Sequence, residues 1–280
     1  MSASAEMVTG LARAEAGRPP LRVRALHLPP PDATGKAGEF CAVELEDGAV
    51  GLSFVLLGDT LARLRSGAAS VAGSIVGMAA LELAGWFASR DGVERTLGYA
   101  AVNALTASLY ARAGYRPPDA TDSLGLLDPQ PGDQVGMVGL FPSLPARVVA
   151  AGARLTVLEL PPALAGEREG YRITLDPAEL AGCNKVLATS TILLNGTLER
   201  ILEACRGAAT LALVGPGASC LPDPLFARGV TLLGGAEVVD PPGFLLALRT
   251  GARWGETTRR VAITAVGHPG LEALLRRVTP

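Results

Sequence analysis

Short apolar runs alternate with helical patterns through the second half of the chain, and this rhythm restricts the fold more than any other feature of the sequence. The apolar runs are predicted to be strands buried on both faces, and they cover residues 134–140, 155–160, 185–188, 210–214 and 230–233. Helical patterns lie between most of them, at residues 144–151, 198–205 and 241–250. Strands that alternate with helices predict a parallel sheet with right-handed crossovers, so we expect an α/β domain here.

The first half has a different order, in which strands come before most of the helices. Strands are predicted at residues 21–28, 40–45 and 50–55, and helices at residues 1–17, 60–66, 71–89 and 93–113. Asp47-Gly48 between two of the strands is a strong hairpin signal. A Pro/Gly-rich linker follows the last helix. We therefore predict a smaller α+β domain at residues 1–116 and the α/β domain at residues 117–280.

The composition favours a folded protein and argues against nucleic acid as a partner. Hydrophobic residues make up 49% of the 280 residues, which is too large a share for a disordered chain. Aromatic residues make up only 4%, and the formal net charge is -2 with no concentration of Lys and Arg. Nucleic-acid binding would need a basic surface, and single strands would also need aromatic platforms.

Neither a signal peptide nor a membrane span is indicated. Glu6 and Arg13 interrupt the first apolar stretch, so we expect a cytoplasmic protein. Residues 71–87 are strongly apolar, but they are short for a span and contain a glutamate. We interpret this segment as a buried helix, in which Gly73 and Gly77 allow close packing on a neighbour, and we expect no membrane insertion.

The cysteines and histidines are too scattered to predict a metal site of their own. No two cysteines have metal-clip spacing, and the two histidines lie far apart in the sequence. We interpret the cysteines as reduced, mostly buried thiols. These residues are Cys41, Cys183, Cys205, Cys220, His27 and His268.

The loops after the predicted parallel strands are the best candidates for a binding site, because ligands bind beyond the carboxyl ends of such strands. The first loop contains Gly139 and Phe141 but lacks the G-x-G-x-x-G pattern of dinucleotide sites. Glu159 ends the second strand, 20 positions after Gly139. An acid at this distance can accept two hydrogen bonds from a ribose diol. The alternative is an exposed glutamate at the start of a loop.

The loop after the third strand is rich in hydroxyl groups. Asn195 or Thr197 can cap the helix that follows, which explains one of them structurally. Capping does not explain Thr189, Ser190 and Thr191 together, and these three predict a polar pocket at the edge of the sheet.

Two other positions leave alternatives open. Gly215-Pro216 begins a loop that lets the backbone approach a ligand, and the loop ends at Cys220. Cys220 is interpreted as a small buried thiol, with a nucleophile or ligand as the alternative. Asn103 either bonds within the packing of its helix or points into a cleft between the domains.

Several short motifs, in the same order and spacing, resemble a heavy-metal-chelation domain family of unknown function. They lie at residues 137–142, 158–160, 189–191, 194–197 and 215–216. Members of this family pair a Rossmann-like C-terminal domain with an N-terminal domain like that of enolase, and residues 98–104, GYAAVNA, resemble a helix of the latter. The resemblance covers residues 39–256. It implies an α/β protein with a Rossmann-like parallel-sheet C-terminal domain and a smaller α+β enolase-N-terminal-like domain.

The resemblance also implies a site in the cleft between the two domains. The sequence departs from the family pattern at Ser190, where glycine is usual, and at residues 217–219, where hydroxyl groups are lost. Together with the strand-end loops, the resemblance gives these candidate ligand-binding residues: Asn103, Gly139, Phe141, Glu159, Thr189, Ser190, Thr191, Asn195, Thr197, Gly215 and Pro216.

Three functions fit these features. The first, implied by the resemblance, is binding of a heavy metal ion or a metal complex. Oxygen donors suit hard cations and heavy metals prefer sulfur, so a bound complex fits better than a bare soft ion. The second is an enzyme that uses an adenine nucleoside cofactor such as S-adenosylmethionine, although no catalytic base stands out. The third is a ligand sensor without catalytic activity, and apolar helix faces favour a homodimer.

Overall fold

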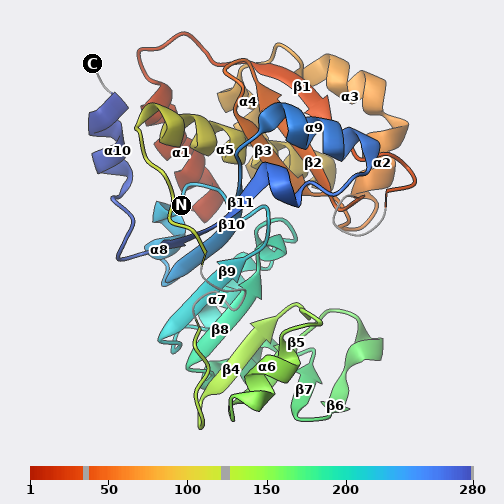
Figure 1. Cartoon of the computed structure of the whole chain (residues 1–280), viewed down its shortest axis with the longest axis vertical. Helices are drawn as coiled ribbons and strands as arrows, with labels where there is room; N and C mark the ends of the chain where they lie inside the picture. Colours follow the sequence, from red (N-terminus) through yellow and green to blue (C-terminus); the bar gives the residue numbers. More distant parts are fainter. Residues whose placement is uncertain (34–37, 121–126, 279–280) are drawn as a thin grey trace.

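The computed structural model describes residues 1–33, 38–120 and 127–278 (Figure 1). Within these residues the chain forms a small antiparallel sheet and a large, mostly parallel sheet, both with helices packed against them. This arrangement confirms the predicted α/β class with a second, smaller α+β part. Where the boundary between the two domains falls stays a prediction.

The small sheet lies between two helices that are far apart in the sequence. Its strands, in the order β1-β2-β3, are β1 (Val23–His27), β2 (Phe40–Leu45) and β3 (Val50–Phe54). β2 and β3 form the predicted hairpin, whose turn contains Gly48 at a φ of 89°. Side chains alternate along a strand, so one face packs on α5 (Gly92–Arg112) while the other, with Phe40 and Leu52, packs on α9 (Pro241–Thr250).

The predicted single helix over residues 71–89 is wrong. The chain forms α3 (Ala68–Ile75), α4 (Ala80–Gly85) and η2 (Trp86–Ala88) instead. Gly77 takes a φ of 81° and donates its N–H to the Val23 carbonyl at 2.8 Å, so the segment bonds to β1 and the helix stops. The close packing predicted for Gly73 and Gly77 is also wrong, because both are exposed and a Cβ on either would meet no described atom within 4 Å.

The large sheet has the strand order β11-β10-β9-β8-β4-β5-β7-β6. Its strands are β4 (Gln134–Val138), β5 (Arg154–Leu158), β6 (Gly166–Arg168), β7 (Tyr171–Thr174), β8 (Lys185–Thr189), β9 (Thr210–Val214), β10 (Leu232–Val238) and β11 (Thr258–Thr264). The six strands from β10 to β7 are parallel, which confirms the prediction for the five expected strands and adds β7, which was not predicted. β6 and β11 are antiparallel edge strands that the sequence pattern did not predict.

The helices at the end of the chain return to its beginning. α10 (Leu271–Val278) contacts both α1 (Ala3–Glu15) and α5, and the Arg13 guanidinium lies 2.6 Å from a Glu272 carboxylate oxygen. No helix in the described parts of the chain has both the length and the apolar character that a membrane span requires. Further helices are α2 (Thr60–Ser66), α6 (Pro145–Ala150), α7 (Leu198–Ala204), α8 (Asp223–Phe226), η3 (Pro162–Leu164), η4 (Pro177–Gly182), η5 (Ser190–Leu193) and η6 (Gly255–Thr257).

Candidate functional site

The loops after β4 and β8 meet at the point where the strand order reverses. From β4 the chain moves to β5 on one side, and it later returns to β8 on the other side of β4. A crevice between such loops is the usual ligand site of open parallel sheets. Gly139 has a φ of 81°, and a Cβ there would lie 2.9 Å from Thr189 Cγ2. Only glycine fits this close approach, so the structure brings two of the predicted residues together at the reversal.

Glu159 lies where it was predicted, directly after β5, but its carboxylate is already engaged. One oxygen accepts the N–H of Leu140 at 2.5 Å, and the other accepts the N–H of Leu160 at 3.2 Å. The carboxylate therefore ties the loop after β4 to the end of β5. Phe141, in the same loop, is partly buried against the core beneath the sheet.

The hydroxyl-rich loop bonds mainly to itself. The Thr189 and Thr191 hydroxyl oxygens lie 3.2 Å apart. Asn195 Oδ1 accepts the N–H of Thr197 at 3.0 Å and its hydroxyl at 2.6 Å. Thr197 is the residue before α7 but makes no side-chain capping bond. Asn195 Oδ1 therefore bonds to Thr197, just before the helix begins. The Asn195 amide nitrogen, Nδ2, has no partner among the described residues.

Ser190, Gly215 and Pro216 connect this loop to the one after β9. Ser190 is buried, and a Cβ on Gly215 would lie 2.5 Å from its hydroxyl oxygen. Gly215 has a φ of 147°, which disfavours any side chain. The Pro216 carbonyl accepts the N–H of Ala236 at 3.3 Å. Ser190 and Gly215 therefore pack the loops after β8 and β9 against each other, and Pro216 ties the second of these loops to β10.

Asn103 donates to two backbone carbonyl groups outside its own helix. It is buried on α5, and its Nδ2 donates to the Leu52 carbonyl at 2.7 Å and to the Gly217 carbonyl at 3.0 Å. The first bond lies beside its own helix, and the second crosses to the loop after β9. Tyr99, one helical turn earlier, donates its hydroxyl to the same Gly217 carbonyl at 2.6 Å.

Arg95 is a residue of the site that sequence reasoning missed. Its Nε donates to the Ser89 carbonyl at 2.8 Å, and one terminal nitrogen donates to the Leu194 carbonyl at 2.8 Å. The same nitrogen lies 3.7 Å from the point that a Cβ on Gly196 would occupy. Arg95, Tyr99 and Asn103 are spaced by four, which places them on one face of a helix. That spacing was the signal that could have found Arg95.

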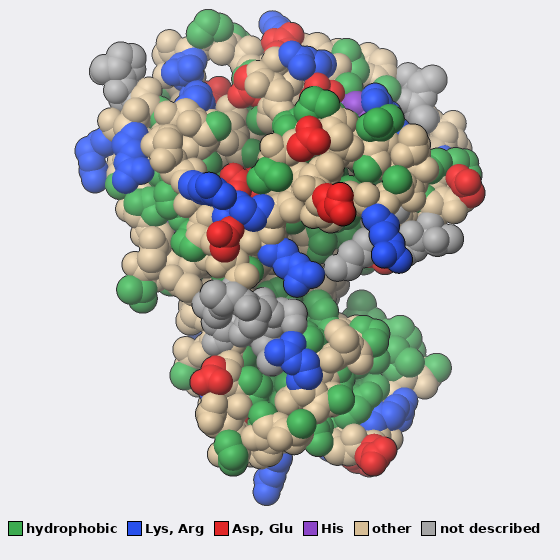
Figure 2. Space-filling model, in the orientation of Figure 1, with side chains coloured by type: hydrophobic (Ala, Val, Ile, Leu, Met, Phe, Trp, Pro, Cys, Tyr) green, Lys and Arg blue, Asp and Glu red, His purple; other side chains and the backbone are tan. Residues whose placement is uncertain are grey.

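The surface is hollowed between the upper and lower parts of the molecule (Figure 2). Hydrophobic side chains gather on the lower part beside this hollow. Leu160 and Leu175 follow β5 and β7 at the carboxyl edge of the sheet and are 68% and 43% exposed. The carboxyl edge therefore presents apolar surface next to the polar loops.

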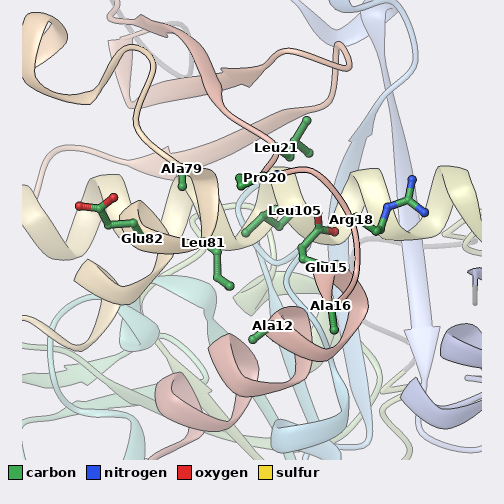
Figure 3. Close-up of a pocket in the computed structure, with 10 residues that line it drawn as sticks. All are labelled: Ala12, Glu15, Ala16, Arg18, Pro20, Leu21, Ala79, Leu81, Glu82 and Leu105. Atoms are coloured by element: carbon green, nitrogen blue, oxygen red, sulfur yellow. The ribbon is translucent and has the colours of Figure 1, made fainter.

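A cavity of about 470 Å³ lies away from these loops, between α1, α4 and α5 (Figure 3). Small apolar side chains such as Ala12, Ala16 and Leu105 line most of it, with Glu15 and Glu82 at its sides. None of the predicted ligand-binding residues lines this cavity.

The donor set does not fit a direct soft-metal site. All four cysteines are buried, and burial raises the pKa of Cys41, Cys205 and Cys220 to about 12 and that of Cys183 to about 11. A thiol must lose its proton to bind a metal. Among the described residues no three His, Cys, Asp or Glu side chains come together as a metal centre would need.

The two histidines are also separately engaged. His27 Nε2 lies 2.9 Å from a Glu44 oxygen, and His268 Nε2 lies 3.1 Å from an Asp223 oxygen. The first pair belongs to the small sheet, and the second joins α8 to the turn before α10. The two pairs therefore lie in different parts of the fold.

Comparison with known families gives a match over more than half of the chain. The profile of the DUF364 family, described as "Putative heavy-metal chelation", matches residues 122–266. This chain belongs to the DUF364 family. A second profile with the same description, DUF4213, matches residues 37–106. The resemblance carried by the strand-end motifs is therefore confirmed.

Two solved DUF364 structures of unknown function have the same fold. The protein from Desulfitobacterium hafniense has a TM-score of 0.68 and 21% identity, over 93% of this chain and 98% of that one. The protein from Pyrococcus horikoshii has a TM-score of 0.66 and 20% identity, over 94% of this chain and 100% of that one. At this level of identity the likeness establishes the fold alone. No curated protein matches the chain.

Proposed function

We propose that this DUF364 protein binds a small ligand at the carboxyl edge of the large sheet, between the loops after β4 and β8. The observation that carries the proposal is the contact of Gly139 with Thr189 at the reversal of strand order. The Arg95 bond to Leu194 and the Asn103 and Tyr99 bonds to Gly217 hold α5 over the neighbouring loops. The other candidate residues line or support the same loops.

A metal would reach this site as a complex with a small organic molecule. The family description supports a metal as cargo. The buried, protonated thiols argue against direct coordination of a soft metal ion. In such a complex the organic molecule satisfies the metal, and the protein contacts only the outer atoms of the complex. The S-adenosylmethionine alternative gains no support from the family match or from the curated proteins.

Calorimetry on the full chain tests this proposal. Free Ni²⁺ and Co²⁺, and their citrate complexes, are titrated into the wild-type protein and into Thr189→Val, which removes a hydroxyl at the reversal point with little change in shape. We expect the complexes to bind, the free ions not to bind, and Thr189→Val to weaken the binding by about tenfold, the usual scale for one lost hydrogen bond to a charged group.

The matched control is Thr9→Val, whose hydroxyl bonds to Ala5 on the exposed face of α1. It should bind like the wild type. Equal binding by Thr189→Val and the wild type, or no heat from any of the four probes, would overturn the proposal.

A further inference from the structure

In and beside the loops after β4 and β8, several acceptors already receive hydrogen bonds from the protein, whereas two donors find no acceptor in the described parts of the chain. On α5, the buried Asn103 Oδ1 is an acceptor without a partner among the described residues. Both Glu159 oxygens, Asn195 Oδ1 and the Leu194 carbonyl already accept a hydrogen bond from the protein. Two donors stay without an acceptor among the described residues, namely Asn195 Nδ2 and the second terminal nitrogen of Arg95. A ligand that meets these groups has to supply acceptors.

Arg95 also brings a positive charge that has no ion-pair partner among the described residues. It is half-buried, and no described carboxylate lies within 4.0 Å of its guanidinium. Its bonds go to two carbonyl groups, which leave the charge in place. A partly buried cation of this kind is stabilised when an anion binds beside it.

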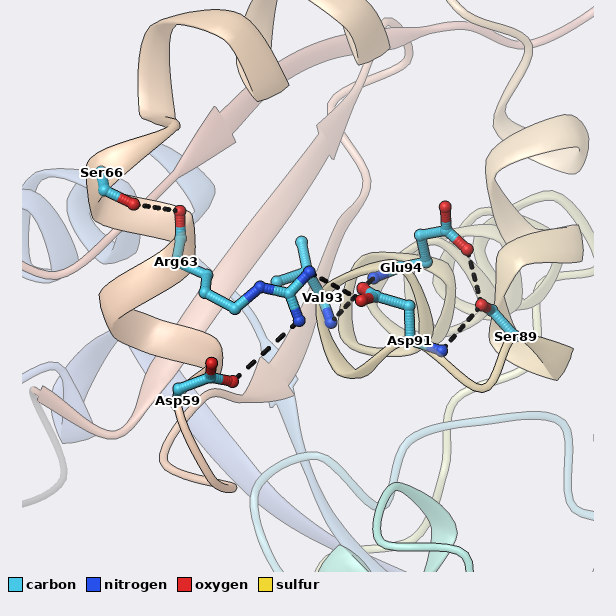
Figure 4. A network of polar contacts seen from close by, with 7 residues as sticks. All are labelled: Asp59, Arg63, Ser66, Ser89, Asp91, Val93 and Glu94. Carbon is cyan, nitrogen blue, oxygen red and sulfur yellow. Dashed lines mark hydrogen bonds and ion pairs between the residues drawn. The ribbon is translucent and has the colours of Figure 1, made fainter.

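The acids closest in sequence are bound to other groups (Figure 4). Asp91 lies 2.6 Å from the Arg63 guanidinium and accepts the N–H groups of Val93 and Glu94 at the start of α5. The Glu94 carboxylate accepts the Ser89 hydroxyl at 2.5 Å. Neighbouring residues of a helix do not face each other, so Glu94 does not screen Arg95 directly.

The donors lie along one continuous line of contacts. Thr189 touches Gly139 and approaches Thr191, and the Thr191 carbonyl accepts the Asn195 N–H at 3.0 Å. The Arg95 guanidinium covers the next turn of the chain, at Leu194 and Gly196. The line therefore runs from the reversal point of the sheet to a cation on α5.

We infer that the ligand of this site is an anion with several carboxylate or phosphate oxygens, and that Arg95 selects it by charge. This inference rests on the proposed function and adds the ligand's chemical class. Both a free polycarboxylate and a metal held in a polycarboxylate shell offer such oxygens. Arg95 and Asn195 would donate to the oxygens while the apolar edge at Leu160 contacts the carbon skeleton.

Titrations with citrate, Ni²⁺-citrate, inorganic phosphate and uncharged glycerol test the inference on the full chain. We expect the anions to bind, glycerol not to bind, and the affinity of the anions to fall as NaCl is raised, because salt screens charge. Arg95→Gln should weaken anion binding by about tenfold or more, and Arg95→Lys, which keeps the charge, should recover part of it. Comparison of citrate with Ni²⁺-citrate shows whether the site prefers a free polycarboxylate or a metal held by one.

Arg65→Gln is the matched control, because Arg65 is a partly buried arginine that also donates to carbonyl groups, those of Pro29 and Pro30. It should leave anion binding unchanged. Circular dichroism of both Arg95 variants shows whether the interdomain bond to Leu194 is needed for folding, and the salt dependence of the wild type stands independently of that result.

The two proposals fail in different ways. If glycerol or another uncharged probe binds, loses affinity in Thr189→Val and keeps it in Arg95→Gln, the site is real and its selection for anions is wrong. If anions bind but neither Thr189→Val nor Arg95→Gln weakens them, both are wrong. Binding that does not respond to salt also overturns the role of charge.

Discussion

At the scale of single residues, the Gly217 carbonyl accepts two hydrogen bonds that join α5 to the loop after β9. It receives the Tyr99 hydroxyl at 2.6 Å and the Asn103 amide at 3.0 Å, both from α5. Both donor side chains are buried. Buried polar groups stabilise a fold only when they are paired, so this carbonyl fixes where α5 can lie relative to the loop after β9.

Two tyrosines on α5 offer a direct test of this pairing. Tyr99→Phe should lower the free energy of unfolding by about 1 kcal/mol, because it removes one buried hydrogen bond while Asn103 still serves the carbonyl. Tyr110→Phe should change it by less than about 0.5 kcal/mol or raise it, because the buried Tyr110 hydroxyl has no partner among the described residues. Urea denaturation measures both, and equal losses would contradict the assignment.

The cysteines should resist modification in the folded protein. Burial holds the pKa of each thiol at about 11 or 12, so almost no reactive thiolate is present at pH 8. A colorimetric thiol reagent should label none of them within the time in which it labels all four after unfolding in urea. Rapid labelling of one cysteine in the native protein would show an accessible thiolate and reopen direct metal binding.

At the scale of elements, α5 packs with its backbone close to its neighbours. A Cβ on Gly98 would lie 2.1 Å from the Phe87 backbone nitrogen, and one on Gly51 in β3 would lie 2.1 Å from the Ala100 carbonyl oxygen. No side chain can move aside to relieve these contacts, because both partners are backbone atoms. The position of α5, and with it Arg95, Tyr99 and Asn103, therefore depends on glycine at both contacts.

Two glycine-to-alanine variants test this dependence on glycine, one at a tightly packed helical position and one at an open helical position. Gly98→Ala should destabilise the protein by about 3 kcal/mol or more, because the helix and η2 have to separate. Gly85→Ala, in α4, meets no described atom within 4 Å and should stabilise by about 0.5–1 kcal/mol through helix propensity. Thermal and urea unfolding report both, and the packing argument fails if the two variants behave alike.

The sequence predicts elements where local pattern decides and misses them where tertiary contacts decide. Residues 40–45 match β2 because the run is apolar and an Asp-Gly turn follows it. β6 is exposed at all three residues and has no apolar run to detect. β11 contains the short buried run Val261-Ala262-Ile263, but it begins with the polar Thr258-Arg259-Arg260 and was not predicted as a strand. The helix over residues 71–89 fails because its break is a bond to β1, which no local pattern reveals.

The site follows the same division. The ends of the strands can be predicted from the sequence, so Gly139, Glu159 and Thr189 were expected at strand ends, where the structure has them. The partners of Glu159 are backbone N–H groups, which every residue but proline has, so the sequence could not say that its carboxylate is already engaged. Likewise, Arg95 belongs to the site only through its hydrogen bond to the Leu194 carbonyl, which lies 99 positions away in the sequence.

At the scale of the whole molecule, the Asp133 carboxyl group makes the free energy of unfolding depend on pH. Hydrogen bonds from Lys185, from Asn184 and from the Gln130 N–H lower its pKa to about 2. A carboxyl group whose pKa is lower in the folded protein contributes stability above its unfolded pKa, and this contribution is lost as the pH falls through the folded value. The loss should occur between about pH 4 and pH 2.

Asp133→Asn should therefore flatten the acid side of the stability curve. The urea midpoint of the wild type should fall between pH 4 and pH 2, and the variant should fall less while starting lower at pH 7. Asp32→Asn, an exposed aspartate with no bonded partner among the described residues, serves as control and should follow the wild type. Parallel curves for wild type and Asp133→Asn would exclude this role.

The position of α9 on the outer face of the small sheet has a consequence for how the protein is made. Phe40 and Leu52 are covered by Phe244 and Leu248, which the ribosome adds only after the whole parallel sheet. During synthesis one apolar face of the small sheet therefore stays exposed until α9 is made, and other chains can associate with this face. We therefore expect a nascent chain stalled before residue 241 to aggregate more readily than the full chain.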